Sequence, residues 1–376
     1  MTPRHLYVHA PFCARRCSYC DFAVQVAADP PVDAWSRCIG RELRQLAAAG
    51  SWPPLPLETL YLGGGTPSLL GVGAVPMLLE RLGDAVRLDG VRELTAEANP
   101  EGFTPELAAD WAAAGVDRVS FGAQTFHEAS LRWMGRLHGP EGPVRAVRTA
   151  RGAGIGNVGL DLIFGLPERL GRDLDADLDR VLALEPEHVS VYGLSVEPDT
   201  PLGRWVAGGR EEMPDQERYG EEYLRVVDRL RAEGYHHYEV SNFARPGKEA
   251  VHNAAYWRGV AYLGLGNGAH SFVGRERWWN RRDWTEYRRA VEDAVSPRAG
   301  SERLDGDAER LERIWLGLRT ASGLDGSALS AAQRERAVRW RDAGWAERDP
   351  DRLRLTPEGW LLLDRLAVEL DDAAAA

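Results

Sequence analysis

Four features that would each assign the chain to a particular class of protein are missing or scarce. No run approaches the roughly 18 apolar residues that a transmembrane helix needs, and the N-terminus, MTPRHLYVHAPFC, does not resemble a signal peptide. Lys plus Arg number 46 against 57 Asp plus Glu, and this formal charge of −11 argues against binding to nucleic acid or to an anionic membrane surface. Cysteine is scarce, with four residues. We therefore expect a cytoplasmic protein with reduced thiols and no nucleic-acid partner.

Three of the four cysteines lie close together, as Cys13, Cys17 and Cys20 in APFCARRCSYCDF. The spacing C-x3-C-x2-C is one ligand short of a structural zinc site, and a disulfide framework prefers an even number of cysteines. Three neighbouring thiolates instead suit a 4Fe–4S cluster that keeps one iron open to an exchangeable ligand. Zinc completed by Cys38 or a histidine is the alternative. Cys38 lies in an amphipathic stretch, WSRCIGRELRQL, and is better interpreted as a small packed hydrophobic residue.

Short β-like runs alternate with amphipathic stretches through the first half of the chain. The expected strands are 6–10, 59–63, 94–99, 118–124, 158–164 and 188–194, and the expected helices are 34–49, 75–88, 105–114, 142–153 and 174–184. Six β–α units of this kind predict an α/β fold with a parallel sheet. We expect a partial (β/α)6 TIM-like barrel, and an open doubly wound sheet is the alternative.

The second half has a looser pattern. Residues 197–220 are polar and rich in Pro and Gly, which predicts a long loop before a helix at 221–233, and the composition changes again at 294–300, as in a linker. A helix with apolar residues from 311 to 318, a hairpin, and a last helix capped by Thr356 predict a small winged-helix-like α+β domain. Because that domain is more acidic than basic, we interpret it as a packing or lid module. The expected divisions are 1–195, 196–295 and 296–376.

Polar residues recur where the predicted strands end. Gly63–Gly65 end the second strand, Glu97 and Gln124 end the third and fourth, and Asp161 lies on the fifth. A lone buried carboxylate is most often a structural hydrogen-bonding partner, but active sites of β/α barrels lie at the carboxyl ends of the strands. The cysteine loop follows the first strand, so we expect these groups to share one site.

These residues resemble a family, the radical S-adenosylmethionine (SAM) proteins of the oxygen-independent coproporphyrinogen III oxidase superfamily. The cysteine motif has Tyr19 before its third cysteine, and GGGTP follows on the second strand, as in that family. The resemblance implies that Cys13, Cys17 and Cys20 ligate three irons of a 4Fe–4S cluster and that SAM binds the fourth. It also implies a set of SAM contacts, namely Tyr7, Gly64, Gly65, Thr66, Glu97, Gln124, Arg136 and Asp161. For Arg136 the competing interpretation is a solvated surface arginine.

Two branches of the superfamily share this core, a coproporphyrinogen III dehydrogenase and the HemW-type heme chaperones. The dehydrogenase has a further cysteine where this chain has Phe22, and it carries an N-terminal extension that this chain lacks. The stretch VHNAAYW matches the H-N-x-x-Y-W motif of the chaperone branch. The resemblance therefore favours a heme chaperone that delivers heme to acceptor hemoproteins. Decarboxylation of coproporphyrinogen III, or radical SAM chemistry on another substrate, is the alternative, and cleavage of SAM stays open.

The heme region expected from this motif contains His252, Asn253, Tyr256 and Trp257. His252 is a candidate iron ligand, Tyr256 a candidate hydrogen-bonding phenol and Trp257 a candidate flat wall for the porphyrin, although lone histidines are more often structural. His236, His237 and His270 compete as ligands. The expected partners are heme, a heme donor, acceptor hemoproteins that include membrane-bound respiratory enzymes, and an electron donor such as a flavodoxin. Association with the membrane would then be peripheral, through the acceptor, and a homodimer is an open alternative.

Overall fold

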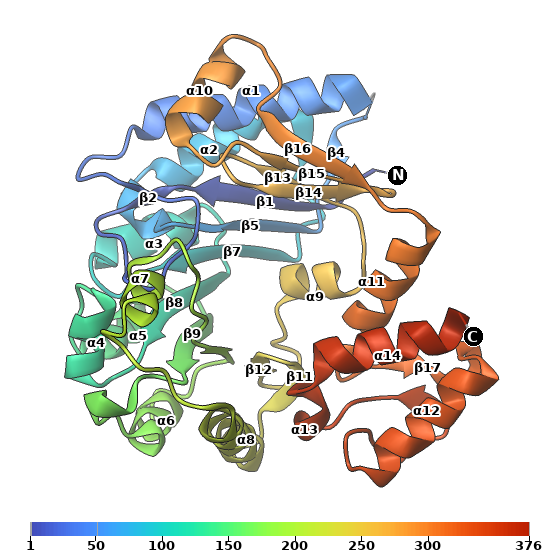
Figure 1. Ribbon diagram of the computed structural model, residues 1–376. Coiled ribbons are helices and arrows are strands. Elements are labelled where there is room, and N and C mark those ends of the chain that lie inside the picture. Colours follow the sequence, from blue (N-terminus) through green and yellow to red (C-terminus); the bar gives the residue numbers. More distant parts are fainter. Residues whose placement is uncertain (1, 51, 376) are drawn as a thin grey trace.

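One curved sheet organises the molecule, as the computed structural model shows for residues 2–50 and 52–375 (Figure 1). It is a 12-stranded sheet in the order β11-β12-β10-β9-β8-β7-β5-β1-β13-β14-β15-β16. Its central strands are β1 (His5–Ala10), β5 (Thr59–Gly64), β7 (Glu93–Ala98), β8 (Arg118–Gln124), β9 (Asn157–Phe164) and β10 (His188–Gly193). These six are parallel and adjacent in chain order. The six predicted strands are therefore confirmed, and no strand end differs from its predicted position by more than one residue.

Strands of the second half extend the sheet at both ends. Next to β1 lie β13 (Tyr262–Leu265), β14 (His270–Val273), β15 (Glu276–Asn280) and β16 (Arg298–Arg303), and beyond β10 lie β12 (Asn242–Ala244) and β11 (His236–Glu239). The sheet order ends at β11 and β16, so the barrel is partial, as predicted. The prediction of a linker at 294–300 is wrong for its last residues, because β16 begins at Arg298 and pairs with β15. The sequence did not indicate β16 because most of its residues are polar or charged, and most of them are exposed.

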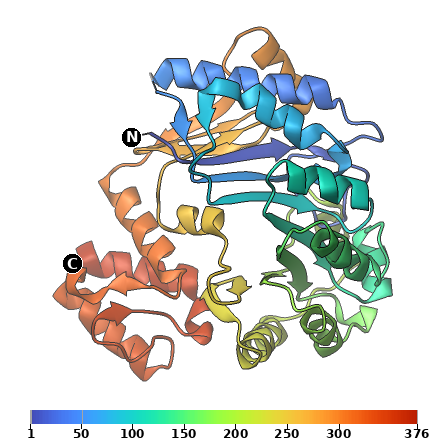
Figure 2. The same cartoon turned by 180° about the vertical axis from the view of Figure 1, so that it is seen from behind.

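Helices cover the outer side of the curved sheet (Figures 1 and 2). In chain order they are α1 (Val32–Gly50), α2 (Ala74–Leu82), α3 (Pro105–Ala113), α4 (Glu128–Met134), α5 (Gly142–Gly152), α6 (Leu174–Leu182) and α8 (Gln216–Ala232). Local signals fix their starts, since the Thr104 hydroxyl accepts a hydrogen bond from Leu107 N at the start of α3. The helix predicted over 75–88 ends early, at Leu82, because Gly83 has a φ of 50° and stops it. No helix among the described residues is long and apolar enough to cross a membrane.

The six central strands alternate between apolar and polar or small residues, except at the end of β9, where Leu162, Ile163 and Phe164 follow one another. On β1, Leu6 and Val8 are fully buried in the main core with residues of the helices, whereas His5, Tyr7 and His9 lie on the other face. Burial of each such aliphatic side chain under the helices stabilises the fold by roughly 1.5–3 kcal/mol. The inner faces of the other strands are polar as well, with residues such as Glu97 on β7, Arg118 and Ser120 on β8, Asp161 on β9 and Ser190 on β10. The inside of the barrel is therefore a polar surface, which a folding role alone would not require.

The segment predicted as a long loop at 197–220 contains helices. Thr200 caps the short helix α7 (Pro201–Ala207), and Asp215 caps α8, which begins at Gln216 instead of 221. In both cases a Ser, Thr or Asp cap in the polar stretch was the missed signal.

The C-terminal unit packs against the β11 edge of the sheet. It contains α11 (Gly306–Leu318), α12 (Ala331–Asp342), α13 (Pro357–Trp360), α14 (Leu363–Ala375) and a small sheet of β17 (Leu324–Asp325) and β18 (Arg352–Leu353). The Thr356 cap is confirmed. The predicted hairpin is reduced to a single bridge between Ala346 and Leu355, since β18 pairs with β17 instead. An ion pair of 2.9 Å between Arg319 and the fully buried Glu239 joins the unit to β11.

Candidate functional site

A cavity of about 420 Å³ opens at the carboxyl ends of the central strands. Most of the residues expected at a cluster and SAM site line it together, namely Cys13, Cys17, Cys20, Gly64, Gly65, Thr66, Glu97, Gln124, Arg136 and Asp161. The cysteines come from the loop after β1, and the others come from or follow β5, β7, β8 and β9. Parallel strands present their carboxyl ends at one edge, which is why positions so distant in the chain meet there.

The glycine segment at the end of β5 is joined to the cysteine loop by backbone hydrogen bonds. Gly65 N donates to Ala10 O over 2.8 Å, and Thr66 N donates to Phe12 O over 2.8 Å. A Cβ atom on Gly65 would lie 2.7 Å from Ala10 O, so any side chain there would push the two segments apart. Gly64 has a φ of 109°, a conformation that favours glycine. The glycines thus bring the backbone of β5 close to the cysteines.

The three thiols of this loop are free and half-buried, and they share the cavity wall. Thr66 Oγ1 donates to Cys13 Sγ over 3.4 Å, and Arg136 Nη1 lies 3.6 Å from Cys17 Sγ. Burial raises the pKa of Cys13 to about 11 and also raises the pKa of Cys20, so binding of a metal cluster would release protons. Among the described residues, no three His, Cys, Asp or Glu side chains are grouped to hold one metal ion. A 4Fe–4S cube binds each thiolate at a different iron, so this donor set fits a cluster better than zinc.

Cys38, the residue considered as a fourth zinc ligand, lies elsewhere. It is 2% exposed and belongs to the main hydrophobic core on α1. Burial raises the pKa of its thiol to about 11. The interpretation of Cys38 as a packed hydrophobic residue is consistent with this environment.

Two half-buried carboxylates, Glu97 and Asp161, face the cavity. Glu97 accepts hydrogen bonds from Tyr61 OH over 2.7 Å and from Gly64 N over 2.9 Å, and Asp161 accepts one from Ser120 Oγ over 3.1 Å. Burial raises the pKa of each carboxyl group, and the charge of Asp161 raises the pKa of Glu97 further. A cationic ligand would relieve that repulsion. SAM carries a sulfonium and an ammonium group, so the carboxylates fit it.

The Arg136 side chain closes another side of the cavity. Its Nη2 donates to Asn99 Oδ1 over 2.6 Å and to Gly122 O over 2.7 Å. This arginine is therefore held inside the site and is not a solvated surface residue. Its fixed positive charge beside the thiols suits the negative charge of a cluster or the carboxylate of SAM. Asn99, which also donates to Thr66 Oγ1 over 3.2 Å, was missed in the sequence, although it ends the TAEAN run that drew attention to Glu97.

Gln124 is held in an unusual backbone conformation. Its φ is 65°, rare for a residue with a side chain, and the pairing of β8 with β9 shifts between Gly122 and Gln124. The bulge turns Gln124 toward the cavity. Strain of this kind persists where the surrounding structure enforces it.

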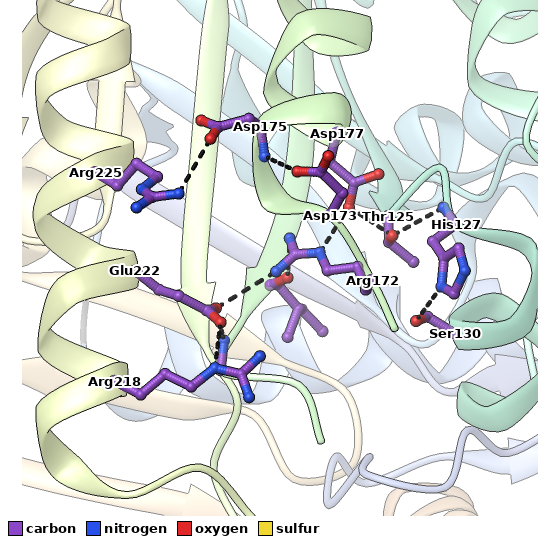
Figure 3. Close-up of polar contacts among 12 residues, drawn as sticks. Thr125, His127, Ser130, Arg172, Asp173, Asp175, Asp177, Arg218, Glu222 and Arg225 are labelled. Atoms are coloured by element: carbon purple, nitrogen blue, oxygen red, sulfur yellow. Dashed lines mark hydrogen bonds and ion pairs between the residues drawn. The ribbon is translucent and has the colours of Figure 1, made fainter. Parts of the chain in front are cut away.

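A buried polar network enforces the conformation just after Gln124 (Figure 3). Asp177 on α6 accepts hydrogen bonds from Thr125 Oγ1 over 2.6 Å, from Phe126 N over 2.7 Å and from Arg172 Nε over 2.9 Å. Arg172 Nη2 also donates to Ile163 O over 3.1 Å. The network therefore fixes the ends of β8 and β9 from outside the cavity.

The same network reaches α8 through Glu222. Its Oε2 accepts from Gly165 N over 2.9 Å and lies 3.5 Å from Arg172 Nη1, and its Oε1 accepts from Arg218 Nε over 3.2 Å (Figure 3). The turn after β9 is thus tied to a helix. The sequence did not predict this hydrogen-bond network, because its residues are far apart in the chain, between 125 and 222.

A second cavity, of about 620 Å³, adjoins the first. Asp21, Phe22, Gly64 and Glu97 line both. Tyr7, expected beside SAM, lines the second cavity and not the first, and its OH is 2.9 Å from His9 Nδ1. Strands β13–β15 and helices α9 (Val251–Trp257) and α11 supply most of the remaining wall.

The expected heme ligand His252 does not face either cavity. Its ring is buried and both nitrogens are hydrogen-bonded, Nδ1 to Thr59 Oγ1 over 2.7 Å and Nε2 to Tyr256 OH over 2.8 Å. Its backbone N donates to Glu93 Oε1 over 3.0 Å. Since Thr59 and Glu93 begin β5 and β7, the histidine fixes α9 at the amino ends of the strands, opposite the cysteines. His252 as iron ligand is therefore corrected to a structural role.

Only some of the other residues of the expected heme region line a cavity. Tyr256 and Trp257 line the second cavity, and Asn253 does not. Among the competing histidines, His236 pairs with Glu249 at 3.2 Å and His237 stacks on Phe243 in the interior, whereas His270 lines the second cavity.

The chain is similar to known proteins in both sequence and fold. Residues 7–181 match the model of the Radical SAM superfamily. The chain is 40% identical over 366 residues to the "Heme chaperone HemW" of Mycobacterium tuberculosis (strain ATCC 25618 / H37Rv), covering 96% of this chain and 93% of the relative. The protein of the same name from Bacillus subtilis (strain 168) is 34% identical over 319 residues, covering 85% of this chain and 84% of the relative. Among solved structures, coproporphyrinogen III oxidase (HemN) from Escherichia coli, a radical SAM enzyme, aligns with a TM-score of 0.83 and 22% identity over 98% of this chain and 90% of that chain.

Proposed function

We propose that this chain, which belongs to the HemW family within the radical SAM superfamily, is a heme chaperone that binds heme and delivers it to acceptor hemoproteins. The observation that carries the proposal is 40% identity along 96% of the chain with a relative of that name. The likeness to HemN, at 22% identity, supports the fold alone.

The first cavity is suited to the cofactors of the superfamily. Cys13, Cys17 and Cys20 would hold a 4Fe–4S cluster, with SAM at the open iron between the glycine segment and the carboxylates. A reduced cluster, when bound, supplies an electron to the sulfonium of SAM. The chain contributes orientation, through Glu97 and Arg136 on opposite charges of SAM, and exclusion of water by the barrel wall.

The acceptors and supporting partners follow from the proposed role. The chaperone would receive heme from a donor and pass it to hemoproteins, which include membrane-bound respiratory enzymes, with peripheral membrane contact through the acceptor. Reduction of the cluster would need an electron donor such as a flavodoxin. A homodimer is compatible with this scheme.

One preparation can test the proposal against the dehydrogenase alternative. The cluster is reconstituted without oxygen, and the same sample is assayed for heme uptake that survives desalting and for conversion of coproporphyrinogen III to protoporphyrinogen IX. We expect about one heme per chain and no conversion. Turnover of coproporphyrinogen III would contradict the chaperone role.

Two cysteine variants separate the cluster from the heme site. Cys17→Ser should lose the iron–sulfur absorbance and fail to transfer heme while still binding it. Cys38→Ser is the matched control, and it should keep the cluster because Cys38 lies in the core. Normal transfer by Cys17→Ser would remove the cluster from the transfer step.

A further inference from the structure

His270 differs from every other histidine of the chain. Each of the other eight has at least one ring nitrogen within hydrogen-bonding distance of another residue. The ring of His270 makes no hydrogen bond to the described part of the chain, and it lines the second cavity. It stacks on Trp279, the partner of His270 across β14 and β15, with ring centroids 5.8 Å apart at 26°. The imidazole is thus oriented while its nitrogens remain available.

The second cavity around His270 has the size and walls that a flat apolar macrocycle needs. Its volume of about 620 Å³ lies within the range of roughly 300–1,000 Å³ found for small-molecule sites. Aromatic side chains line it, from Trp257 on α9, Tyr262 and Phe272 on β13 and β14, and Trp315 on α11. Phe22, at the boundary with the first cavity, is 62% exposed, which is unusual for so large an apolar side chain. An apolar ligand lying on it would remove this surface from water.

A positive charge without a carboxylate partner stands at the same cavity. Arg282 is exposed and donates to Asp21 O, but it forms no ion pair with the described residues. Arg277, the neighbouring cation, is already paired with Glu302 at 2.9 Å and Glu312 at 2.8 Å. Arg282 is therefore the arginine best placed to pair with an anionic substituent of a ligand.

From these observations we propose that heme binds in the second cavity, with His270 as its axial iron ligand and Arg282 as partner of a propionate. The proposal rests on the proposed chaperone function and adds the place and the ligand. Heme is an apolar ring with an iron that takes imidazole and with two carboxylates at one edge, and the cavity supplies a group for each. Burial, with help from Arg277 and Arg282, lowers the pKa of His270, so its neutral form is favoured near pH 7.

Heme bound in the second cavity would lie next to the proposed SAM site. Asp21, Phe22, Gly64 and Glu97 line both cavities, so the two ligands would share the wall that these four residues form. The helices α9 and α11 face the opening of the sheet in Figure 1. Trp257 of α9 and Trp315 of α11 line the cavity. The H-N-x-x-Y-W stretch would then act through Tyr256 and Trp257 as wall, with His252 holding α9 in position.

The test compares His270→Ala with His236→Ala in the full chain carrying its cluster. Hemin is titrated into each variant and followed by Soret absorbance, and electron paramagnetic resonance reports the axial ligand. His270→Ala should bind heme at least tenfold more weakly and lose the histidine-ligated signature, and added imidazole should restore the Soret band. His236→Ala, an exposed histidine on β11, should match the unchanged protein. Arg282→Gln should weaken binding three- to tenfold and keep the histidine signature.

These outcomes separate the proposed position of heme from the proposed chaperone function. If His270→Ala keeps both the heme affinity and the axial iron ligation of the unchanged protein, the proposed position of heme is wrong. The same holds if His252→Gln, shown by circular dichroism to be folded, loses the histidine signature while His270→Ala retains it. If the unchanged protein binds no heme, the proposed chaperone function itself fails.

Discussion

The carboxylate of Glu97 accepts a hydrogen bond from the backbone N–H of Gly64 over 2.9 Å, and both residues line both cavities. The bond joins β7 to the end of β5. A second bond from Tyr61 OH, 2.7 Å long, orients the carboxylate from the inner face of β5. A ligand in either cavity would therefore meet the same fixed carboxylate, which makes Glu97 the first residue to test.

Replacing Glu97 by Gln should weaken binding of SAM about tenfold or more, equal to at least about 1.4 kcal/mol. The amide removes the negative charge and turns a donor toward Gly64 N–H or Tyr61 OH. Because burial raises the pKa of Glu97, protonation sets in above the pH of an ordinary carboxyl group, so SAM affinity should fall as the pH is lowered. Equilibrium dialysis of SAM at several pH values measures both effects. Glu106→Gln, an exposed position on α3, should change neither.

Gly65→Ala should reduce the amount of cluster that the protein holds after reconstitution. The added Cβ would lie 2.7 Å from Ala10 O and 2.8 Å from Phe12 O, so the cysteine loop must move away from β5. Iron and sulfide content per chain measures the loss. Gly90→Ala is the control, because a Cβ there meets only Leu57 O, at 3.6 Å. Full cluster content in Gly65→Ala would show that the close approach is not needed.

Asp177→Asn should destabilise the fold and weaken SAM binding together. Arg172 and Asp177 are both nearly buried, with 4% and 3% of their side chains exposed, and breaking such a pair costs about 3–5 kcal/mol. The loss also frees Thr125 and Phe126, which hold Gln124 in its strained conformation. Denaturant unfolding and SAM titration measure the two effects. Asp179→Asn, on the same helix but 67% exposed, should stay within about 1 kcal/mol.

Glu42 should make stability decrease as the pH rises. Its buried carboxyl group meets Gly266 N at 2.9 Å, Tyr287 OH at 2.6 Å and Asn280 Nδ2 at 2.5 Å, yet burial still raises its pKa to about 7. Since the folded-state pKa lies above the unfolded value of 4.5, the contribution is complete below about pH 4.5 and is lost as the pH passes about 7. That interval corresponds to on the order of 3 kcal/mol.

Unfolding by denaturant from pH 4.5 to 8.5 measures this dependence in the unchanged protein and in Glu42→Gln. The variant has no proton to lose at this position, so its stability should vary less with pH over the range, whatever its absolute value. Parallel pH curves for the two proteins would contradict the prediction.

The sequence predicted the barrel well because its signals are local. Each central strand is a short alternating run next to a helix with a recognisable cap or glycine stop, as at Thr104 and Gly83. The strand β16 and the helix α7 escaped prediction for the opposite reason. Their residues are polar, and only pairing with β15 or a cap at Thr200 gives them their structure.

By itself the sequence determined the cysteine spacing, the strand order of the core and the polar residues at its carboxyl edge, because chain-local patterns and parallel pairing fix all three. Tertiary structure decided the rest. Whether a histidine can bind a ligand depends on what its ring nitrogens already contact, and Thr59, 193 residues before His252, takes that capacity away. His270 keeps it only because β14 turns its ring toward an open cavity whose walls come from β1, α9 and α11. Contacts over such distances in the chain leave no periodic trace in the sequence.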